Sequence, residues 1–390
     1  MSLSLVLVLA VAALVPLVAV RLRLPGALLE IVAGIVLGPS LLGWIRPDAT
    51  INALSLLGLS FLLFLAGSEV DLRRFRGTLG KRVGASLGIS VVAAALVVAV
   101  LLMLGVGGAV VIGVALMATS SGLVVPVLAD SGALNRPIGR VAIAGASAGE
   151  VAAVVLLSVG LSGGDTPLAG RILLLVLLLA GLVVIGLAVA GVEHSMRLSA
   201  MFVRLADTSA QIRVRWTVLL VAGLALAAQV LGFEAILGAF LAGMLVRALD
   251  PDPEHTHPLY PVKLEAVGYG LLVPVFFITS GLTLDLRGLM EHPGALATVP
   301  AFLLALLFVR GLPAVAFHGE IGRREVLALG LLQATSLPFL IAATAIGREM
   351  GVLDPAVGAG LVAAGLVSVL VFPAVVLALL PRQAAVSVAA

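Results

Sequence analysis

Long apolar runs, separated by short polar segments, follow one another along the whole chain. A helix needs about 20 predominantly apolar residues to cross a bilayer, so this pattern predicts thirteen membrane-spanning helices. They cover residues 3–20, 27–44, 52–69, 83–105, 108–129, 138–161, 171–195, 211–231, 233–248, 265–284, 294–318, 324–347 and 355–380. We therefore expect an all-α polytopic membrane protein whose surroundings are the lipid bilayer.

The composition agrees with this pattern. Of the 390 residues, 62% are hydrophobic and only 11% are charged, whereas soluble domains are roughly 25% charged. Cysteine is absent, which excludes disulfides, thiol catalysis and thiolate metal sites. The net charge of +3 does not indicate a nucleic-acid partner, because Lys and Arg in membrane proteins mainly record topology.

The basic residues alternate in number from loop to loop, as the helix count requires. Eighteen lie on one predicted side, at Arg21, Arg23, Arg73, Arg74, Arg76, Lys81, Arg82, Arg136, Arg140, Arg197, Arg204, Arg213, Arg215, Arg247, Lys263, Arg323, Arg324 and Arg382. The other side has four, at Arg46, Arg171, Arg287 and Arg348. Since cytoplasmic loops carry the excess, we expect a cell (inner) membrane protein with its N-terminus outside and its C-terminus in the cytoplasm.

Segments of the two halves of the chain resemble each other in the same order. The pairs are "LAGSEVDL" (65–72) with "TSGLTLDL" (279–286), "LMATSSGLVVPVL" (116–128) with "LLQATSLPFLIAA" (331–343), and Glu30, Gly34, Gly38 with Glu234, Gly238, Gly243. Matched helices are seven apart, so the halves have opposite orientations in the membrane. Inverted repeats are typical of secondary transporters. We expect one transporter domain over 1–390, with repeat one at 1–161, a linker helix at 171–195 and repeat two at 211–380.

Two of the matched segments predict interrupted helices. "ATSSG" (118–122) combines hydroxyls with a glycine, and "ATSLP" (334–338) combines hydroxyls with a proline. Proline removes a backbone donor and clashes with the preceding turn. Unwound backbone at membrane depth is tolerated where it lines a site or is buried in protein, so these breaks predict a transport site. The alternative is a pair of kinked but continuous helices, with Ser and Thr bonding their own backbone.

Two charged residues lie inside predicted spans. Glu150 is near the centre of the span at 138–161, and Arg310 is the one basic residue inside a span. Charge at such depth is costly and is a functional hypothesis by default. Glu150 can exchange a proton for a cation, or it can be a protonated structural residue. Arg310 can offset nearby negative charge, or its side chain can reach the interface.

The other polar residues have simpler interpretations. Asp71 and Asp285 are expected to cap helices at the interface, and Glu30 and Glu234 lie near helix starts, where negative charge is favourable. The five histidines are assigned to helix ends or to the polar loop at 250–261. The sequence shows no zinc-ligand cluster, catalytic triad or phosphate-binding loop, so no cofactor is expected.

Several motifs resemble the monovalent cation:proton antiporter-2 family, which includes bacterial Na+/H+ exchangers and Kef-type K+ systems. They are "LPGALLEIVAGIVLGPSLLG" (24–43), "LLFLAGSEVDLRRFR" (62–76), "ATSSGLVVPVLADSGALNRPIGR" (118–140), "GAFLAGML" (238–245) and "KLEAVGYGLLVPVFFITSGLTLDL" (263–286). The resemblance implies a thirteen-helix fold with two crossed, unwound helices, a homodimer and elevator-like alternating access. It also implies that Glu150 is the ion-binding acid and that Arg310 is the basic residue of the eleventh helix.

One departure from the family pattern bears on stoichiometry. Family members usually carry two polar residues where this chain has Gly149 and Glu150, preceded by Ser147 and Ala148. The resemblance therefore favours electroneutral exchange, and it leaves Glu150 itself as a candidate partner for Arg310. Kef-type relatives often have a cytoplasmic nucleotide-binding domain. None is expected within this chain, so such regulation would need a separate cytoplasmic subunit.

The sequence thus predicts an antiporter, not an enzyme, that exchanges Na+ or K+ for H+ at Glu150. The remaining oxygen ligands, which suit hard cations, are expected from Ser147, Thr119, Ser120, Ser121, Thr335 and Ser336. Two alternatives stay open at this point. One is a cation-coupled symporter of an organic anion, and the other is an intramembrane enzyme or a non-transporting structural subunit.

Overall fold

The computed structural model describes residues 3–22, 24–71, 75, 77–161, 167–193, 211–249, 259–291 and 293–380, and every regular element in these ranges is a helix. Within these ranges, ten helices are long and apolar enough to cross a membrane. Three shorter apolar helices cover Gly26–Leu37, Ser121–Asp130 and Ala235–Leu249. The all-helical membrane fold is confirmed, whereas the count of thirteen spans stays a prediction.

The helices group into two compact units, each of which takes segments from both predicted repeats. The first unit consists of Met1–Leu14, Pro47–Asp71 and Val154–Thr279. It holds α3 (Ala49–Glu69), α8 (Leu168–Glu193), α10 (Ile212–Val230), α11 (Ala235–Leu249), α13 (Leu259–Val267), the π-helix η2 (Gly268–Leu272), most of α14 (Val273–Leu282), the start of α1 (Leu3–Leu22) and the end of α7 (Pro137–Leu161).

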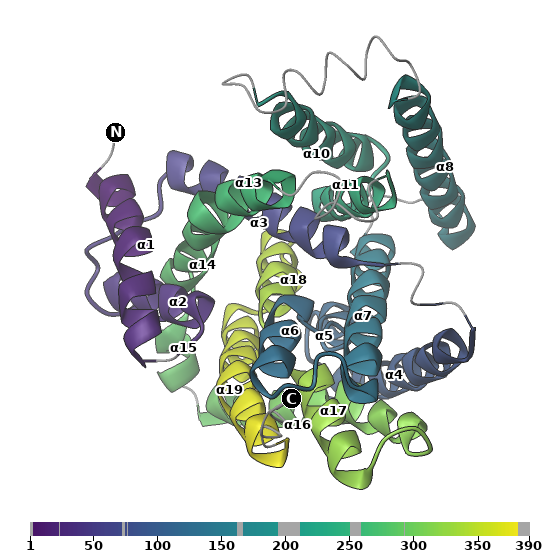
Figure 1. The fold of residues 1–390 in the computed structure, drawn as a ribbon. Helices are drawn as coiled ribbons and strands as arrows, with labels where there is room; N and C mark the ends of the chain where they lie inside the picture. Colours follow the sequence, from purple (N-terminus) through teal and green to yellow (C-terminus); the bar gives the residue numbers. More distant parts are fainter. Residues whose placement is uncertain are drawn as a thin grey trace, which may run out of the picture. The chain divides into compact units, whose positions relative to one another are not determined.

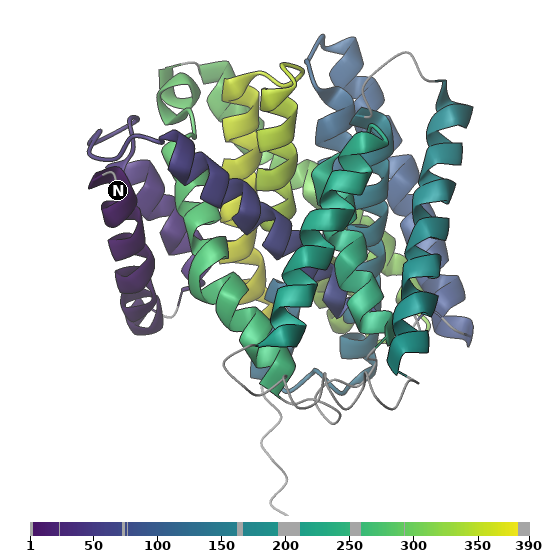
Figure 2. The same ribbon diagram turned by 90° about the horizontal axis from the view of Figure 1, so that it is seen from above.

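The second unit consists of Val15–Arg46, Leu72–Ala153 and Ser280–Ala390. It holds α2 (Gly26–Leu37), α4 (Gly77–Met103), α5 (Ala109–Ala115), α6 (Ser121–Asp130), most of α7, α15 (Leu286–Glu291), α16 (Pro293–Leu306), the π-helix η3 (Leu307–Gly311), the 3-10 helix η4 (Leu312–Phe317), α17 (Arg323–Ala334), α18 (Pro338–Glu349) and α19 (Pro355–Leu379). Within it α5 packs against α18, and α6 packs against α19 (Figure 1). The yellow-green α18 and the yellow α19 lie side by side in Figure 2.

Glycines bring helix pairs into close contact in each unit. In the first unit, a Cβ added at Gly67 of α3 would lie 2.1 Å from the Phe240 carbonyl oxygen of α11, and one at Gly243 would lie 2.0 Å from that of Phe64. Small residues allow backbones to approach closely in membranes, where van der Waals packing drives helix association. α3 and α11 are therefore packed almost backbone to backbone.

The second unit has the equivalent contact between α2 and the end of α14. A Cβ at Gly281 would lie 2.1 Å from the Ile31 carbonyl oxygen, and one at Gly38 would lie 3.1 Å from Leu282 Cα. Gly67 and Gly281, and likewise Gly38 and Gly243, are the glycines that the sequence repeat pairs. Each predicted repeat thus contributes the same glycine to the same type of helix crossing, as a structural repeat requires.

Both predicted breaks interrupt helices, so the alternative of continuous kinked helices is excluded. α5 ends at Ala115 and α6 begins at Ser121, while α17 ends at Ala334 and α18 begins at Pro338. Proline disfavours helical backbone in the residue before it, which accounts for the second break. In the first half Pro126 lies inside α6, so the hydroxyl-rich stretch itself marks that break.

Two π-helical segments precede prolines. η3 (307–311) is followed by Pro313, and η2 (268–272) is followed by Pro274. Proline has no N–H to donate to the carbonyl four residues earlier, and π-turns are a common local adjustment in α-helices, frequently at functional sites. Arg310 belongs to η3, so this adjustment changes the face of the helix on which Arg310 lies.

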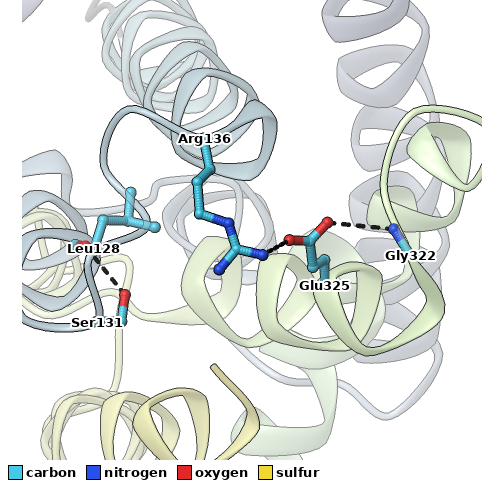
Figure 3. A network of polar contacts seen from close by, with 5 residues as sticks. All are labelled: Leu128, Ser131, Arg136, Gly322 and Glu325. Atoms are coloured by element: carbon cyan, nitrogen blue, oxygen red, sulfur yellow. Dashed lines mark hydrogen bonds and ion pairs between the residues drawn. The ribbon is translucent and has the colours of Figure 1, made fainter. Parts of the chain in front are cut away.

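One ion pair links the loop before α7 to the start of α17 (Figure 3). Arg136 Nη2 donates to Glu325 Oε1, and Glu325 Oε2 accepts from the Gly322 N–H at 3.3 Å. The side chains of Arg136 and Glu325 are both partly buried. Glu325 therefore caps α17 and anchors the loop that follows α6, which holds together elements that carry the two breaks.

The structure bears on several of the simpler expectations. Asp285 caps α15, because its Oδ1 accepts from the Gly288 N–H at 2.9 Å. Glu234 directly precedes α11, whereas Glu30 is the fifth residue of α2 and is buried. Four histidines and seven of the basic residues counted above lie outside the described residues: His194, His255, His257, His292, Arg23, Arg73, Arg74, Arg76, Arg197, Arg204 and Arg382.

Candidate functional site

The two helix breaks meet within the second unit. The Ser120 N–H donates to the Thr335 carbonyl oxygen at 3.1 Å, and the Thr119 hydroxyl donates to the Gln333 carbonyl oxygen at 2.5 Å. Each break therefore satisfies backbone groups that the other has left without helical partners. This arrangement lets irregular backbone persist at membrane depth, because protein covers it.

Glu150 lies beside the first break. It belongs to α7, and its residue surface is 8% exposed. The Ser121 hydroxyl donates to Glu150 Oε2 at 3.1 Å, and Ser121 is the first residue of α6. A helix N-terminus carries partial positive charge, so the start of α6 favours a carboxylate at this position.

Arg310 is fully enclosed and donates to three neutral acceptors. Nε donates to Thr119 Oγ1 at 2.9 Å, Nη1 to Ser90 Oγ at 3.3 Å and Nη2 to the Gly145 carbonyl oxygen at 2.7 Å. Arg310 therefore links α4, the first break and α7 through these three bonds.

Gly149 explains how Arg310 reaches α7. A Cβ at Gly149 would lie 2.6 Å from Arg310 Nη2, 2.7 Å from Arg310 Cζ and 2.8 Å from the Met117 carbonyl oxygen. The guanidinium thus occupies the space that a side chain at this position would fill. At the position of Gly149 the family pattern usually has a polar residue. In the structure, the bare backbone of Gly149 is the surface on which Arg310 packs.

The other predicted ligands lie in the same region of the second unit. Ser147 and Thr119 are buried, whereas Ser120 is only partly buried. The Thr335 hydroxyl donates back to the Leu331 carbonyl oxygen at 2.9 Å. The Ser336 N–H donates to Ser368 Oγ at 3.3 Å. Thr119 and Ser120 are therefore bonded to the second break, and Ser121 is bonded to Glu150. The Thr335 hydroxyl instead bonds a carbonyl of α17.

Sequence reasoning missed four residues of this region. Ser90 and Gly145 hold Arg310, Ser368 bonds the second break, and Gln333 is completely buried beside it. Serines and glycines are common in apolar helices, so the first three gave no distinctive sequence pattern. An amide inside an apolar span at 324–347 was a usable indication for Gln333.

The fold and the meeting breaks define a multi-pass membrane protein of the interrupted-helix transporter class. The chain belongs to the sodium/hydrogen exchanger family, since the family described as "Sodium/hydrogen exchanger, transmembrane" matches residues 7–381. This membership confirms the resemblance to the cation:proton antiporters that the sequence motifs indicated.

Individual relatives agree with this family. Over 390 residues the chain is 30% identical to "Putative Na(+)/H(+) antiporter YjbQ" of Bacillus subtilis (strain 168), covering 95% of this chain but only 62% of YjbQ. It is 30% identical over 276 residues to "Na(+)/H(+)-K(+) antiporter GerN" of Bacillus cereus, covering 69% of this chain and 68% of GerN. The solved structure of the sodium proton antiporter MjNhaP1 from Methanocaldococcus jannaschii matches with a TM-score of 0.63 at 17% identity, covering 96% of this chain and 97% of that one. The relatives are named as transporters and not as enzymes.

Proposed function

We propose that this protein exchanges a monovalent cation, Na+ or K+, for H+ across the cell membrane. The observation that carries the proposal is the place of Glu150, a buried carboxyl that accepts from Ser121 where two interrupted helices meet. Such helix breaks form the ion sites of secondary transporters. The names of YjbQ and GerN support cation/proton exchange in particular.

Glu150 couples the two fluxes by binding one ion at a time. Its carboxylate takes either a proton or the cation, because both occupy the same oxygen atoms. Hydroxyl and carbonyl oxygens suit hard cations. Ser121 contacts Glu150, Ser147 lies one helical turn before it in α7, and Ser120 lies next to Ser121 at the first break. Thr119, Thr335 and Ser336 contribute at the breaks, through carbonyl oxygens where their hydroxyls are engaged.

With one carboxyl, one proton exchanges for one cation, and transport is electroneutral. Arg310 keeps its charge throughout the cycle, because a guanidinium does not deprotonate in proteins. Its three bonds to neutral groups hold α4, α7 and the first break together. Arg310 thus acts as a fixed charge that offsets the carboxylate of Glu150 and the negative C-terminal ends of α5 and α17.

Alternating access requires the site to face each side of the membrane in turn. We infer that the second compact unit, which holds the site, moves as a body in an elevator-like cycle. The first unit provides the dimerisation half of a homodimer. The N-terminus lies outside and the C-terminus in the cytoplasm, as the 18-to-4 split of basic residues favours.

The competing functions have less support. A symporter of an organic anion needs several polar groups around a larger cavity, whereas the charged side chains that the structure shows bonded at the first break are one acid, Glu150, and one base, Arg310. An intramembrane enzyme would have to use the Ser121 hydroxyl beside Glu150 as its nucleophile, but this hydroxyl lies where two helix breaks meet, an arrangement typical of transporter ion sites. The names of the relatives also favour transport.

The electroneutral stoichiometry predicts exchange that is independent of voltage. Purified protein in proteoliposomes should show Na+- or K+-driven proton movement whose steady-state rate is the same at imposed potentials of either sign. No net charge crosses the membrane per cycle, so the membrane potential supplies no driving force. A rate that changes systematically with voltage would contradict the one-for-one stoichiometry. Equal dissipation of the pH gradient by an organic anion would favour the symporter.

A further inference from the structure

Gln333 is a buried polar residue whose side chain makes no hydrogen bond to any part of the chain that the structure describes. It is the second-to-last residue of α17 and is 0% exposed. Within the described residues neither Nε2 nor Oε1 has a hydrogen-bond partner. Burying an amide in this way is unfavourable compared with an apolar residue of similar size. In a native protein such a group calls for an explanation, and a bound ion or water is one of the established ones.

The amide of Gln333 lies against the elements that form the ion site. A Cβ at Gly145 would lie 2.5 Å from Gln333 Nε2, 3.1 Å from Cδ and 3.6 Å from Oε1, so the amide packs on α7 through its nitrogen. Gly145 also accepts from Arg310, and the Gln333 carbonyl oxygen accepts from Thr119. The side chain therefore belongs to the network that joins Arg310 and the two breaks.

A second side chain without a partner lies three residues further on. Ser336 is fully buried and its Oγ makes no hydrogen bond in the described part of the chain, although Ser368 bonds its backbone. Gln333 lies just before the break between α17 and α18, and Ser336 lies within the break itself, at Thr335 to Leu337. Two side-chain oxygen atoms that lack a hydrogen-bond partner in the described residues therefore belong to one break, and oxygen atoms are the ligands that suit hard cations.

We propose that Gln333 is a cation-binding residue, whose amide oxygen coordinates the transported Na+ or K+ together with oxygen atoms of the breaks. This inference rests on the proposed cation/proton exchange. α17 then supplies the second polar side chain that α7 lacks at Gly149. The amide oxygen adds a ligand for the cation. Because the amide is neutral, it does not add a second proton-binding acid to the site. Unlike Glu150, it binds the cation and never the transported proton.

The proposal predicts a change in cation affinity without loss of the exchange reaction. Gln333→Met keeps the length of the side chain and removes its oxygen. In proteoliposomes it should raise the apparent KM for the cation by about tenfold, because one oxygen ligand to a charge is lost. The maximal rate at saturating NaCl or KCl should be retained, and the order of preference among Na+, Li+ and K+ should change. The thermal stability should be unchanged or higher, since an unsatisfied amide has been removed.

Thr344→Val is the matched control. Thr344 is buried within α18, and its hydroxyl also lacks a partner in the described residues, but it is the seventh residue of α18 and so lies about two helical turns beyond the break. Its removal should leave KM and ion preference at the wild-type values. If Gln333→Met fails to fold, Gln333→Asn, which keeps the amide on a shorter side chain, should change the ion preference.

The outcomes separate this inference from the proposed function. If the wild-type protein moves no protons when Na+, Li+ or K+ is added, the exchange function itself is wrong. If the wild-type protein exchanges cations and Gln333→Met has the same KM and ion preference, the cation-binding role of Gln333 is overturned. Unchanged ion preference in a folded Gln333→Asn would overturn it equally.

Discussion

Glu150→Gln should abolish cation-driven proton movement in proteoliposomes. The substitution keeps the size of the side chain and an oxygen that can accept from Ser121, but it removes both the negative charge and the proton-binding group. Losing a buried charge interaction costs about 3 kcal/mol or more, which corresponds to a decrease of at least roughly 100-fold. The exchange rate, followed with a pH-sensitive dye, should fall to that of protein-free vesicles.

Two variants control for this result. Glu150→Asp keeps a carboxylate on a shorter side chain and should retain measurable exchange. Glu349→Gln makes the same carboxylate-to-amide change at the exposed end of α18 and should behave as the wild type. Exchange by Glu150→Gln at a rate near that of Glu349→Gln would show that another group binds the ions.

Gly149→Ala should destabilise the protein and displace Arg310. The added methyl group would lie 2.6 Å from Arg310 Nη2 and 2.8 Å from the Met117 carbonyl oxygen. The side chain can move away, but the backbone carbonyl of Met117 cannot do so without disturbing the first break. Overpacking of this kind costs about 1–3 kcal/mol. A lower melting temperature in detergent, together with reduced exchange, is the expected result.

Gly88→Ala is the matched substitution. Gly88 lies in α4, and a Cβ there would meet nothing within 4 Å. Replacing a helical glycine by alanine is favourable by roughly 0.5–1 kcal/mol where there is room. The control should therefore be as stable as the wild type or more so. Equal stability and exchange in both variants would mean that Arg310 does not depend on the bare backbone of α7.

Some features of the site could be predicted from the sequence because they break the apolar pattern. A carboxylate such as Glu150 is costly at the bilayer centre, so its presence alone pointed to a function. Each half of the chain has one hydroxyl-rich stretch, "ATSSG" in the first and "ATSLP" in the second. The structure confirms that both stretches interrupt helices. The membrane fold followed from the length of the apolar runs.

Other features depend on how helices pack and could not be predicted in this way. Arg310 lies in a π-helical segment, which changes the direction in which its side chain points. Placing Arg310 on a regular α-helix therefore could not predict its three hydrogen-bond acceptors. Gly149 gave no sign that it accommodates a guanidinium, because the absence of a side chain has no chemical pattern. Gln333 is neutral and therefore hardly alters the hydropathy of its span. Its lack of a hydrogen-bond partner becomes visible only in three dimensions.

Proton release on cation binding is the most direct test of the central claim that Glu150 alone exchanges a proton for a cation. Protonated protein in weakly buffered detergent solution would be titrated with NaCl or KCl at constant ionic strength, with released protons measured by a pH electrode. We predict that release saturates at one proton per chain in the wild-type protein and is absent in Glu150→Gln. Release of two protons per chain, or undiminished release by Glu150→Gln, would contradict the account.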